Sequence, residues 1–137
     1  MDLQVIDSSV AYKWLSEFNE KGVNDALDLL YAHRAGSILL TAPSTLYVEL
    51  ANAVTCAGHI TEGQSLSIIG ALGDLGIELV EASPPRLEAA ARLSHLHRIS
   101  VYDALFLQLA DEFDCPLVTA DRRAFANIDT DVEIRLI

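Results

Sequence analysis

Two aspartates directly or closely follow short apolar runs, where a side chain at the end of a buried strand could do chemistry. Asp7 comes after the run Leu3–Ile6, and Asp121 comes shortly after Leu117–Thr119. Turn and helix-capping aspartates are common at such places, so each alone also fits a structural role. Carboxylates that share a cleft raise one another's pKa values unless a cation is present. Such a site would suit Mg²⁺ or Mn²⁺, which prefer oxygen ligands and can activate water against a phosphodiester.

Two further acidic residues lie in stretches that are otherwise apolar. Glu49 has apolar neighbours on both sides, and Asn52 is three residues on, so the two share one face of a helix. Burying a carboxylate and an amide is costly without partners, although a solvent-facing stripe would also explain them. Asp103 stands near the start of the apolar stretch 101–110, where the helix dipole alone favours an acid. Because that helix is expected to be buried, its start should face the same crevice as Asp7.

The elements that must position these acids alternate between strand and helix patterns. Short apolar runs predict strands at 3–6, 38–41, 77–80, 117–119 and 132–136. Helical patterns lie at 10–15, 22–35, 44–58, 62–75, 86–97 and 101–113. This alternation predicts an α/β fold with a mostly parallel central sheet of four to five strands, covered on both faces. Ligands of such sheets bind beyond the carboxyl ends of the strands.

The composition favours one folded unit, 1–137, and limits the partners. The chain has 137 residues with 51% hydrophobic residues, enough for a core and too many for a disordered chain. It carries 20 acidic and 9 basic residues, a formal charge of −11. That charge excludes a generic basic nucleic-acid coat, whose affinity comes from Lys and Arg clusters. To approach phosphate, the protein needs a metal, a basic partner or a local basic patch.

The sequence predicts a cytoplasmic protein with no membrane segment. The first residues lack a basic region followed by a long apolar run, and no apolar run approaches the roughly 18 residues that span a bilayer. Cys56 and Cys115 lie 59 positions apart without metal-ligand spacing. We expect both to be small buried hydrophobes in a reducing compartment.

The sequence resembles the PIN-domain ribonucleases, and among them the VapC-type toxins of toxin–antitoxin pairs. Four stretches carry the resemblance over nearly the whole chain: 5–15 (VIDSSVAYKWL), 42–54 with Glu49 and Asn52, 101–110 (VYDALFLQLA), and 116–123 (PLVTADRR). Each stretch alone is a weak pattern. Together they contain all four acids in the family's order, with matching flanks.

The resemblance implies a three-layer α/β/α sandwich in which Asp7, Glu49, Asp103 and Asp121 form a catalytic site for Mg²⁺ or Mn²⁺. It implies an endoribonuclease that inhibits translation until a small VapB-type antitoxin neutralises it by placing a basic residue in the site. A homodimer is also implied. The residues expected to support the acids or contact RNA are Ser8, Lys13, Asn52, Thr119, Arg122 and Arg123.

The basic and histidine side chains each fit more than one role. Lys13 could hold a substrate phosphate, pair with a carboxylate, or lie on the surface with its stem on Trp14. Arg122 and Arg123 could contact RNA or be solvated turn residues. His95 and His97, two apart on a helix, do not share a face and are expected to be ordinary histidines.

Two other functions remain open from the sequence. A receiver-like signalling domain also gathers carboxylates around Mg²⁺, but it needs an early acidic pair and a late lysine, and no lysine follows Lys21. A PIN-like module could also bind a partner without catalysis, since sequence cannot show that the acids converge.

Overall fold

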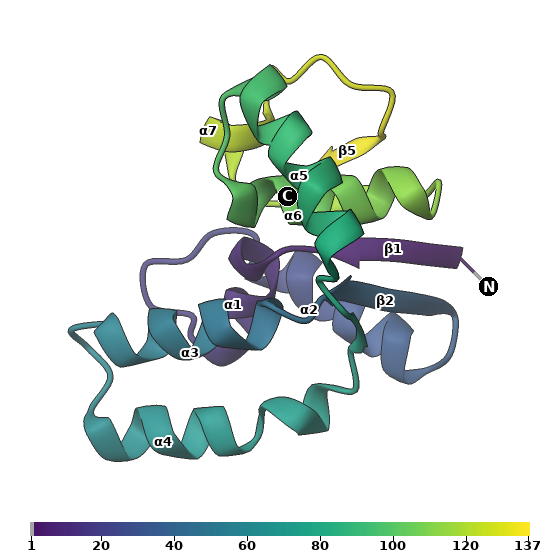
Figure 1. Ribbon diagram of the computed structural model, residues 1–137. Helices are drawn as coiled ribbons and strands as arrows, with labels where there is room; N and C mark the ends of the chain where they lie inside the picture. Colours follow the sequence, from purple (N-terminus) through teal and green to yellow (C-terminus); the bar gives the residue numbers. More distant parts are fainter. Residues whose placement is uncertain (1) are drawn as a thin grey trace.

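A five-stranded sheet forms the centre of the computed structural model, which describes residues 2–137 (Figure 1). Met1, where the predicted domain begins, lies outside the described residues. The strands are β1 (Asp2–Ile6), β2 (Ile38–Pro43), β3 (Glu78–Val80), β4 (Leu117–Thr119) and β5 (Ile134–Leu136). Their order is β3-β2-β1-β4-β5, and every neighbouring pair is parallel. The predicted α/β sheet is therefore confirmed, with five strands and β1 in the middle.

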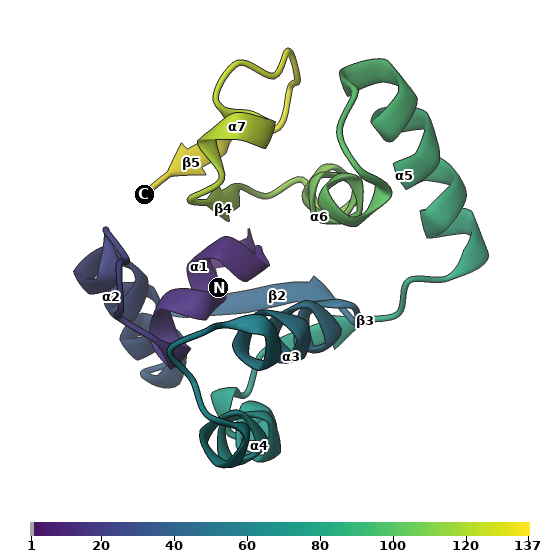
Figure 2. The ribbon, with the colours of Figure 1, turned by 90° about the vertical axis from the view of Figure 1, so that its left-hand side faces the viewer.

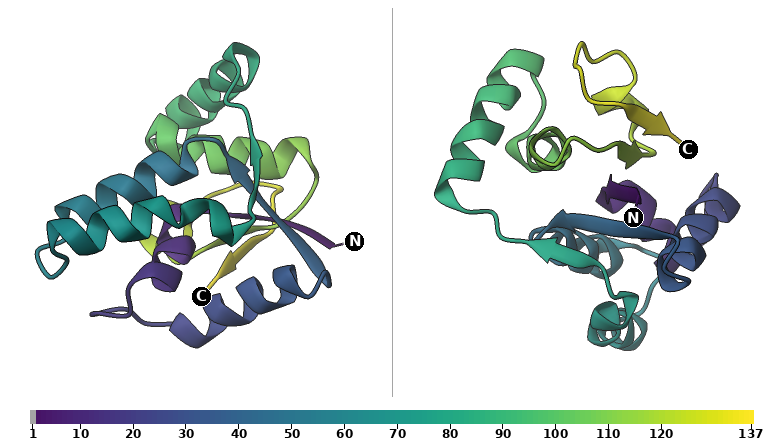
Figure 3. Two further views of the ribbon diagram at one scale, coloured as in Figure 1. Left: turned by 90° about the horizontal axis from the view of Figure 1, so that it is seen from below. Right: turned by 90° about the vertical axis from the view of Figure 1, so that its right-hand side faces the viewer.

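Helices cover both faces of this sheet, which confirms the three-layer α/β/α prediction. They are α1 (Ser8–Leu15), α2 (Val23–Arg34), α3 (Leu46–Cys56), α4 (Glu62–Gly70), α5 (Pro84–His97), α6 (Val101–Glu112) and α7 (Arg122–Phe125). Figures 2 and 3 show α1 to α4 on one side of the sheet and α5 and α6 on the other. Among the helices of residues 2–137, none has the length and apolar character needed to cross a membrane.

The helix prediction is wrong in two respects. The expected helix 62–75 is divided into α4 and a short 3₁₀ helix, η1 (Leu72–Leu75), which ends at Gly76 with φ at 68°. Glycine adopts this left-handed conformation without strain, and the glycines in this stretch weaken a continuous α-helix. The helix α7 was not predicted, because four residues are too few to show helical periodicity.

The strand order brings the ends of β1 and β4 together. Ile6 of β1 pairs with Val118 of β4, and the backbone N–H of Asp7 donates to the carbonyl of Val118 at 3.3 Å. The next residues of both strands therefore leave the sheet at the same edge. Asp7 begins α1 as its N-cap, and Asp121 begins α7 in the same way. Capping and a place in the candidate site are thus compatible roles for each aspartate.

The helix α6 places Asp103 at this edge because the rest of the helix is buried. Residues 104–110 are buried without interruption, since α6 packs against β1 and β2 on one side and α5 on the other. This position explains why residues 104–110 are apolar on every side of the helix except at Gln108. Phe106, in the middle of this stretch, is 1% exposed.

We expect Phe106→Ala to lower the free energy of unfolding by about 3–5 kcal/mol, because it leaves a cavity under the sheet. Urea denaturation followed by circular dichroism measures the change. Leu96→Ala is the matched control, because Leu96 is 73% exposed on α5 and its loss should change stability by less than about 0.5 kcal/mol. Equal effects of the two substitutions would contradict the burial of α6.

Candidate active site

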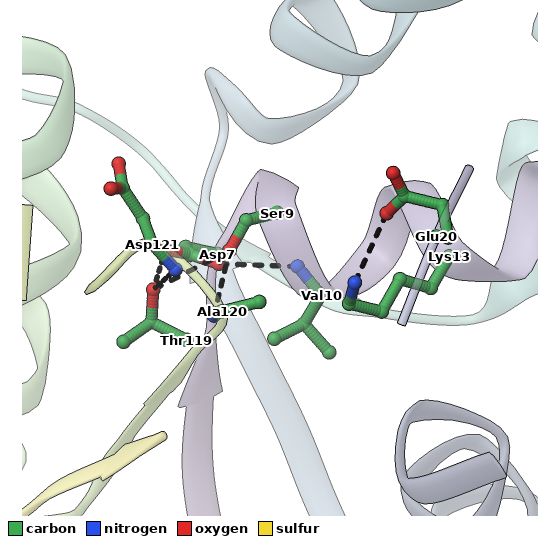
Figure 4. A network of polar contacts seen from close by, with 8 residues as sticks. All are labelled: Asp7, Ser9, Val10, Lys13, Glu20, Thr119, Ala120 and Asp121. Atoms are coloured by element: carbon green, nitrogen blue, oxygen red, sulfur yellow. Dashed lines mark hydrogen bonds and ion pairs between the residues drawn. The ribbon is translucent and has the colours of Figure 1, made fainter. Parts of the chain in front are cut away.

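Asp7 is the most constrained acid at this edge of the sheet. Its carboxylate is 4% exposed and accepts hydrogen bonds from Ser9 Oγ at Oδ1 and from Thr119 Oγ1 at Oδ2, each at 2.5 Å (Figure 4). The backbone N–H of Val10 also donates to Oδ1, at 3.3 Å. Burial raises the pKa of Asp7 to about 6, although these three hydrogen bonds favour the charged form, and the negative charge of Asp121 adds to the rise.

The hydroxyl groups that hold Asp7 are themselves held by the backbone after β4. Ser9 Oγ accepts from the N–H of Ala120 at 2.9 Å, and Thr119 Oγ1 accepts from the N–H of Asp121 at 3.0 Å. The start of α1 and the turn after β4 are therefore joined by one network of polar contacts (Figure 4). This network determines the orientation of the Asp7 carboxylate.

Glu49 reaches the same region from the first turn of α3. Ser8 Oγ donates to its Oε1 at 3.2 Å, whereas Oε2 is buried and has no hydrogen-bond partner within residues 2–137. Burial raises the pKa of Glu49 to about 7, and the charges of Asp103 and Asp7 add to the rise, whereas the nearby hydroxyl groups of Ser8 and Thr45 oppose it. An unpartnered buried carboxylate oxygen is costly, so this atom is suited to a cation.

Asp103 and Asp121 complete the acidic region. Asp103 lies in the first turn of α6, whose N-cap Ser100 accepts from the Asp103 N–H at 3.0 Å. Burial raises the pKa of Asp103, and the charge of Asp121 raises it further. Asp121 Oδ1 accepts from the N–H of Ala124 at 3.1 Å. Electrostatic repulsion thus links all four carboxylates, as Asp7 interacts with Asp121 and Glu49 interacts with Asp7 and Asp103.

The donor set fits a hard divalent cation. All four side chains offer carboxylate oxygens, and Glu49 Oε2 lacks another partner among the described residues. Within residues 2–137, however, no group of three or more Asp, Glu, His or Cys side chains is arranged to hold a metal ion already. The four acids therefore share one region but would have to draw closer to bind one cation together.

The other predicted site residues differ in their placement. Ser8 and Thr119 contact Glu49 and Asp7, as described above. Asn52 is exposed, and its only side-chain hydrogen bond within residues 2–137 comes from Cys56 Sγ at 3.5 Å. Arg122 and Arg123 are exposed on α7, next to Asp121.

One alternative for Lys13 and the prediction for Cys56 are wrong. Lys13 is not a surface lysine with its stem on Trp14, because it is 7% exposed and its Nζ lies 3.0 Å from Glu20 Oε1. It pairs with a carboxylate, but not with one of the four acids. Cys56 is exposed rather than buried, because it lies in the last turn of α3, while Cys115 is partly buried. Both thiols are free.

Ser9 and Glu20 take part in the site's polar contacts but were not predicted from the sequence. Ser9 directly bonds Asp7, and its place two residues after a strand-end aspartate in a helix's first turn could have indicated this role. Glu20 lies in the connection between α1 and α2, and no local pattern indicates that it pairs with Lys13.

The raised pKa values predict that the metal-free protein loses stability as the pH rises from about 4 to 7. Unfolded carboxyl groups release their protons near pH 4. Folded Asp7 and Glu49 keep theirs to about 6 and about 7, so in this range the folded state binds more protons and the free energy of unfolding falls.

Asp7→Asn should remove part of this fall, between pH 4 and about 6. Urea denaturation in EDTA at several pH values measures the slope, and Asp111→Asn, an exposed substitution at the other end of α6, should keep the wild-type slope. Equal slopes for all three proteins would contradict the assigned environment of Asp7.

Comparisons with known proteins agree with this fold. The family model for the PIN domain matches residues 5–131. Ribonuclease VapC1 of Mycobacterium tuberculosis is 33% identical over 99 residues, which cover 70% of this chain and 73% of that protein.

Solved structures share the fold at lower identity. VapBC2 from Rickettsia felis, bound to a DNA fragment from its promoter, matches with a TM-score of 0.71 and 16% identity over 98% of each chain. VapC20 of M. tuberculosis, a toxin that cleaves the sarcin–ricin loop, matches with a TM-score of 0.70 and 12% identity over 95% of this chain and 98% of that one. The family match spans both the strand-end aspartates and the acids of α3 and α6, and the chain therefore belongs to the PIN domain family, as a relative of the VapC proteins.

Proposed function

We propose that the protein is a Mg²⁺- or Mn²⁺-dependent endoribonuclease and the toxin of a toxin–antitoxin pair. The observation that carries this proposal is the buried carboxylate of Asp7, held by two hydroxyl groups beside the unpartnered Oε2 of Glu49. Family membership and the similarity to a ribonuclease support it. The receiver-like alternative is excluded by the family match over residues 5–131.

All four acids have the same part in this proposal, and nearby hydroxyl groups support two of them. Asp7, Glu49, Asp103 and Asp121 would hold the cation, and the hydroxyl groups of Ser8, Ser9 and Thr119 would orient the first two of them. A bound divalent cation would neutralise the phosphodiester and lower the pKa of water.

In-line attack of water on phosphorus expels the 3′ oxygen and leaves 5′-phosphate and 3′-hydroxyl ends. Ser9 and Thr119 keep Asp7 in one orientation throughout, so the site needs little rearrangement around this residue. The carboxylates of Asp103 and Asp121, which begin α6 and α7, are the groups expected to adjust their positions around the cation.

Asp103→Asn should lower RNA cleavage by more than about a hundredfold, because residues that only support a metal ligand already change activity 10–100-fold. The assay is digestion of total RNA with the purified protein, with Mg²⁺ or EDTA, followed by mapping of the 5′ ends. Asp111→Asn, on the same helix but exposed and outside the acidic region, is the control and should cleave normally. Full activity of Asp103→Asn, with circular dichroism unchanged, would contradict the part given to this acid. Absence of Mg²⁺-dependent cleavage by the wild type would instead favour a non-catalytic binding module.

We further infer a VapB-type antitoxin partner. The similar structures include VapBC complexes, and the chain's charge of −11 would attract a basic segment toward the acidic region. That the protein is cytoplasmic and forms a homodimer stays a prediction from the sequence.

A short gene next to this one should encode the antitoxin, and its product should stop RNA cleavage at a 1:1 ratio. The inhibition should weaken as the salt concentration rises, because basic side chains approach carboxylates. A titration of cleavage rate against antitoxin at two salt concentrations measures both effects. Continued cleavage with excess antitoxin would contradict the partner.

A further inference from the structure

A cavity of about 620 Å³ borders the acidic region; none of the four acids lines it, but residues that adjoin Asp7 and Asp121 do. Its walls come from α1, from the connection to α2, from the end of α3 and from Ala120 after β4. Three of its lining residues, Ser8, Ser9 and Ala120, also belong to the polar network of Asp7 and Glu49. A part of the substrate bound in the cavity would therefore lie next to the phosphate that is cleaved at the acids. Its volume is within the range of about 300–1,000 Å³ that is usual for small-ligand sites.

The Lys13–Glu20 ion pair lines this cavity and has no role in the proposed cleavage. Among residues 2–137, Lys13 is the only Lys or Arg that is buried. It is four residues after Ser9 on α1, so it lies on the same helix face, about 6 Å further along the axis. Figure 4 shows Lys13 on α1 paired with Glu20, which lies in the connection to α2. An ion pair with a buried lysine contributes little net stability, so stability alone does not account for this pair.

The pair has unused hydrogen-bonding capacity. An ammonium group has three N–H donors, and Lys13 uses one of them on Glu20 Oε1. Glu20 Oε2 accepts no hydrogen bond from residues 2–137, and Glu20 is 24% exposed, so this oxygen is open to a ligand. A cationic donor and a carboxylate acceptor are therefore presented side by side.

We propose that the cavity holds the nucleoside next to the scissile phosphate and that Lys13 and Glu20 select guanine there. This inference rests on the proposed ribonuclease activity. Guanine presents the O6 acceptor beside two adjacent donors, N1–H and N2–H, on its Watson–Crick edge. A carboxylate can accept from both donors while an ammonium group donates to O6. Adenine, cytosine and uracil lack two adjacent ring and amino donors, so they cannot make this set of contacts.

The same cavity fits RNA better than the antitoxin segment. Tyr12 lines the cavity and offers an aromatic ring of the kind on which unpaired RNA bases stack. A basic peptide segment would gain nothing from the ammonium group of Lys13, whereas the four acids nearby attract it. The cavity thus suits an RNA base, whereas the four acids suit a cation or a basic side chain.

The test uses short RNAs that differ only in the nucleotides flanking the mapped cleavage position. Wild-type protein should cleave RNA with guanosine at one flanking position about tenfold faster than RNA with inosine, which lacks the 2-amino group, because one bidentate base contact gives discrimination of this order. This comparison changes only the substrate, so it does not depend on the folding of a variant.

Glu20→Gln should cleave the guanosine and inosine RNAs at equal rates. Glu133→Gln is the matched control, because Glu133 forms an exposed ion pair with Arg135 outside the cavity, and it should keep the tenfold difference. Equal cleavage of both RNAs by the wild type would overturn the inference, as would a tenfold difference that survives Glu20→Gln. A loss of rate on both RNAs by the same factor, or a weakened antitoxin complex with discrimination intact, would also overturn it. Absence of any cleavage by the wild type would contradict the proposed function itself.

Discussion

The burial of one carboxylate at the end of the central strand is the constraint on which the site depends. Asp7 is 4% exposed, and a charged group at this depth is stable only with hydrogen bonds or a cation. Ser9 and Thr119 provide those bonds, and their own acceptor positions are filled by backbone N–H groups after β4. The network therefore couples the start of α1 to the turn after β4, and it orients the first acid before any ligand binds.

The remaining acids take their places from elements packed around this network. Glu49 comes from α3 on one side of the sheet, and Asp103 comes from α6 on the other side, whose burial determines where its first turn lies. Burial raises the pKa values of Asp7, Glu49 and Asp103, and the repulsion among the carboxylates adds to the rise. A bound divalent cation would favour the charged forms instead. Part of the overall charge of −11 thus lies in the acidic region, where it would attract a cation and a basic partner.

The basic residues have an unexpected distribution. Arg122 and Arg123 are exposed near Asp121, while Lys13 is buried against Glu20 beside the acids. An RNA held at such a site would have few direct contacts from cations to its phosphates. Recognition would then depend on the metal and on the shape and polar groups of the neighbouring cavity, more than on general attraction to the backbone.

The sequence by itself determined the parallel α/β fold and the approximate strands, because apolar runs are local patterns. It also predicted the four acids, Asp7 and Asp121 from their places after such runs and Glu49 and Asp103 from their places in otherwise apolar stretches. Residues 117–119 and Asp121 are an example in which one short stretch indicates both a strand and a candidate site residue after its end. The tertiary structure alone decided that Ser9 bonds Asp7, that Lys13 is buried against Glu20, and that Cys56 is exposed. The first two features depend on contacts between residues that are not adjacent in the sequence. The exposure of Cys56 depends on which face α3 presents to its neighbours. The local pattern of apolar residues carries no information about such tertiary contacts.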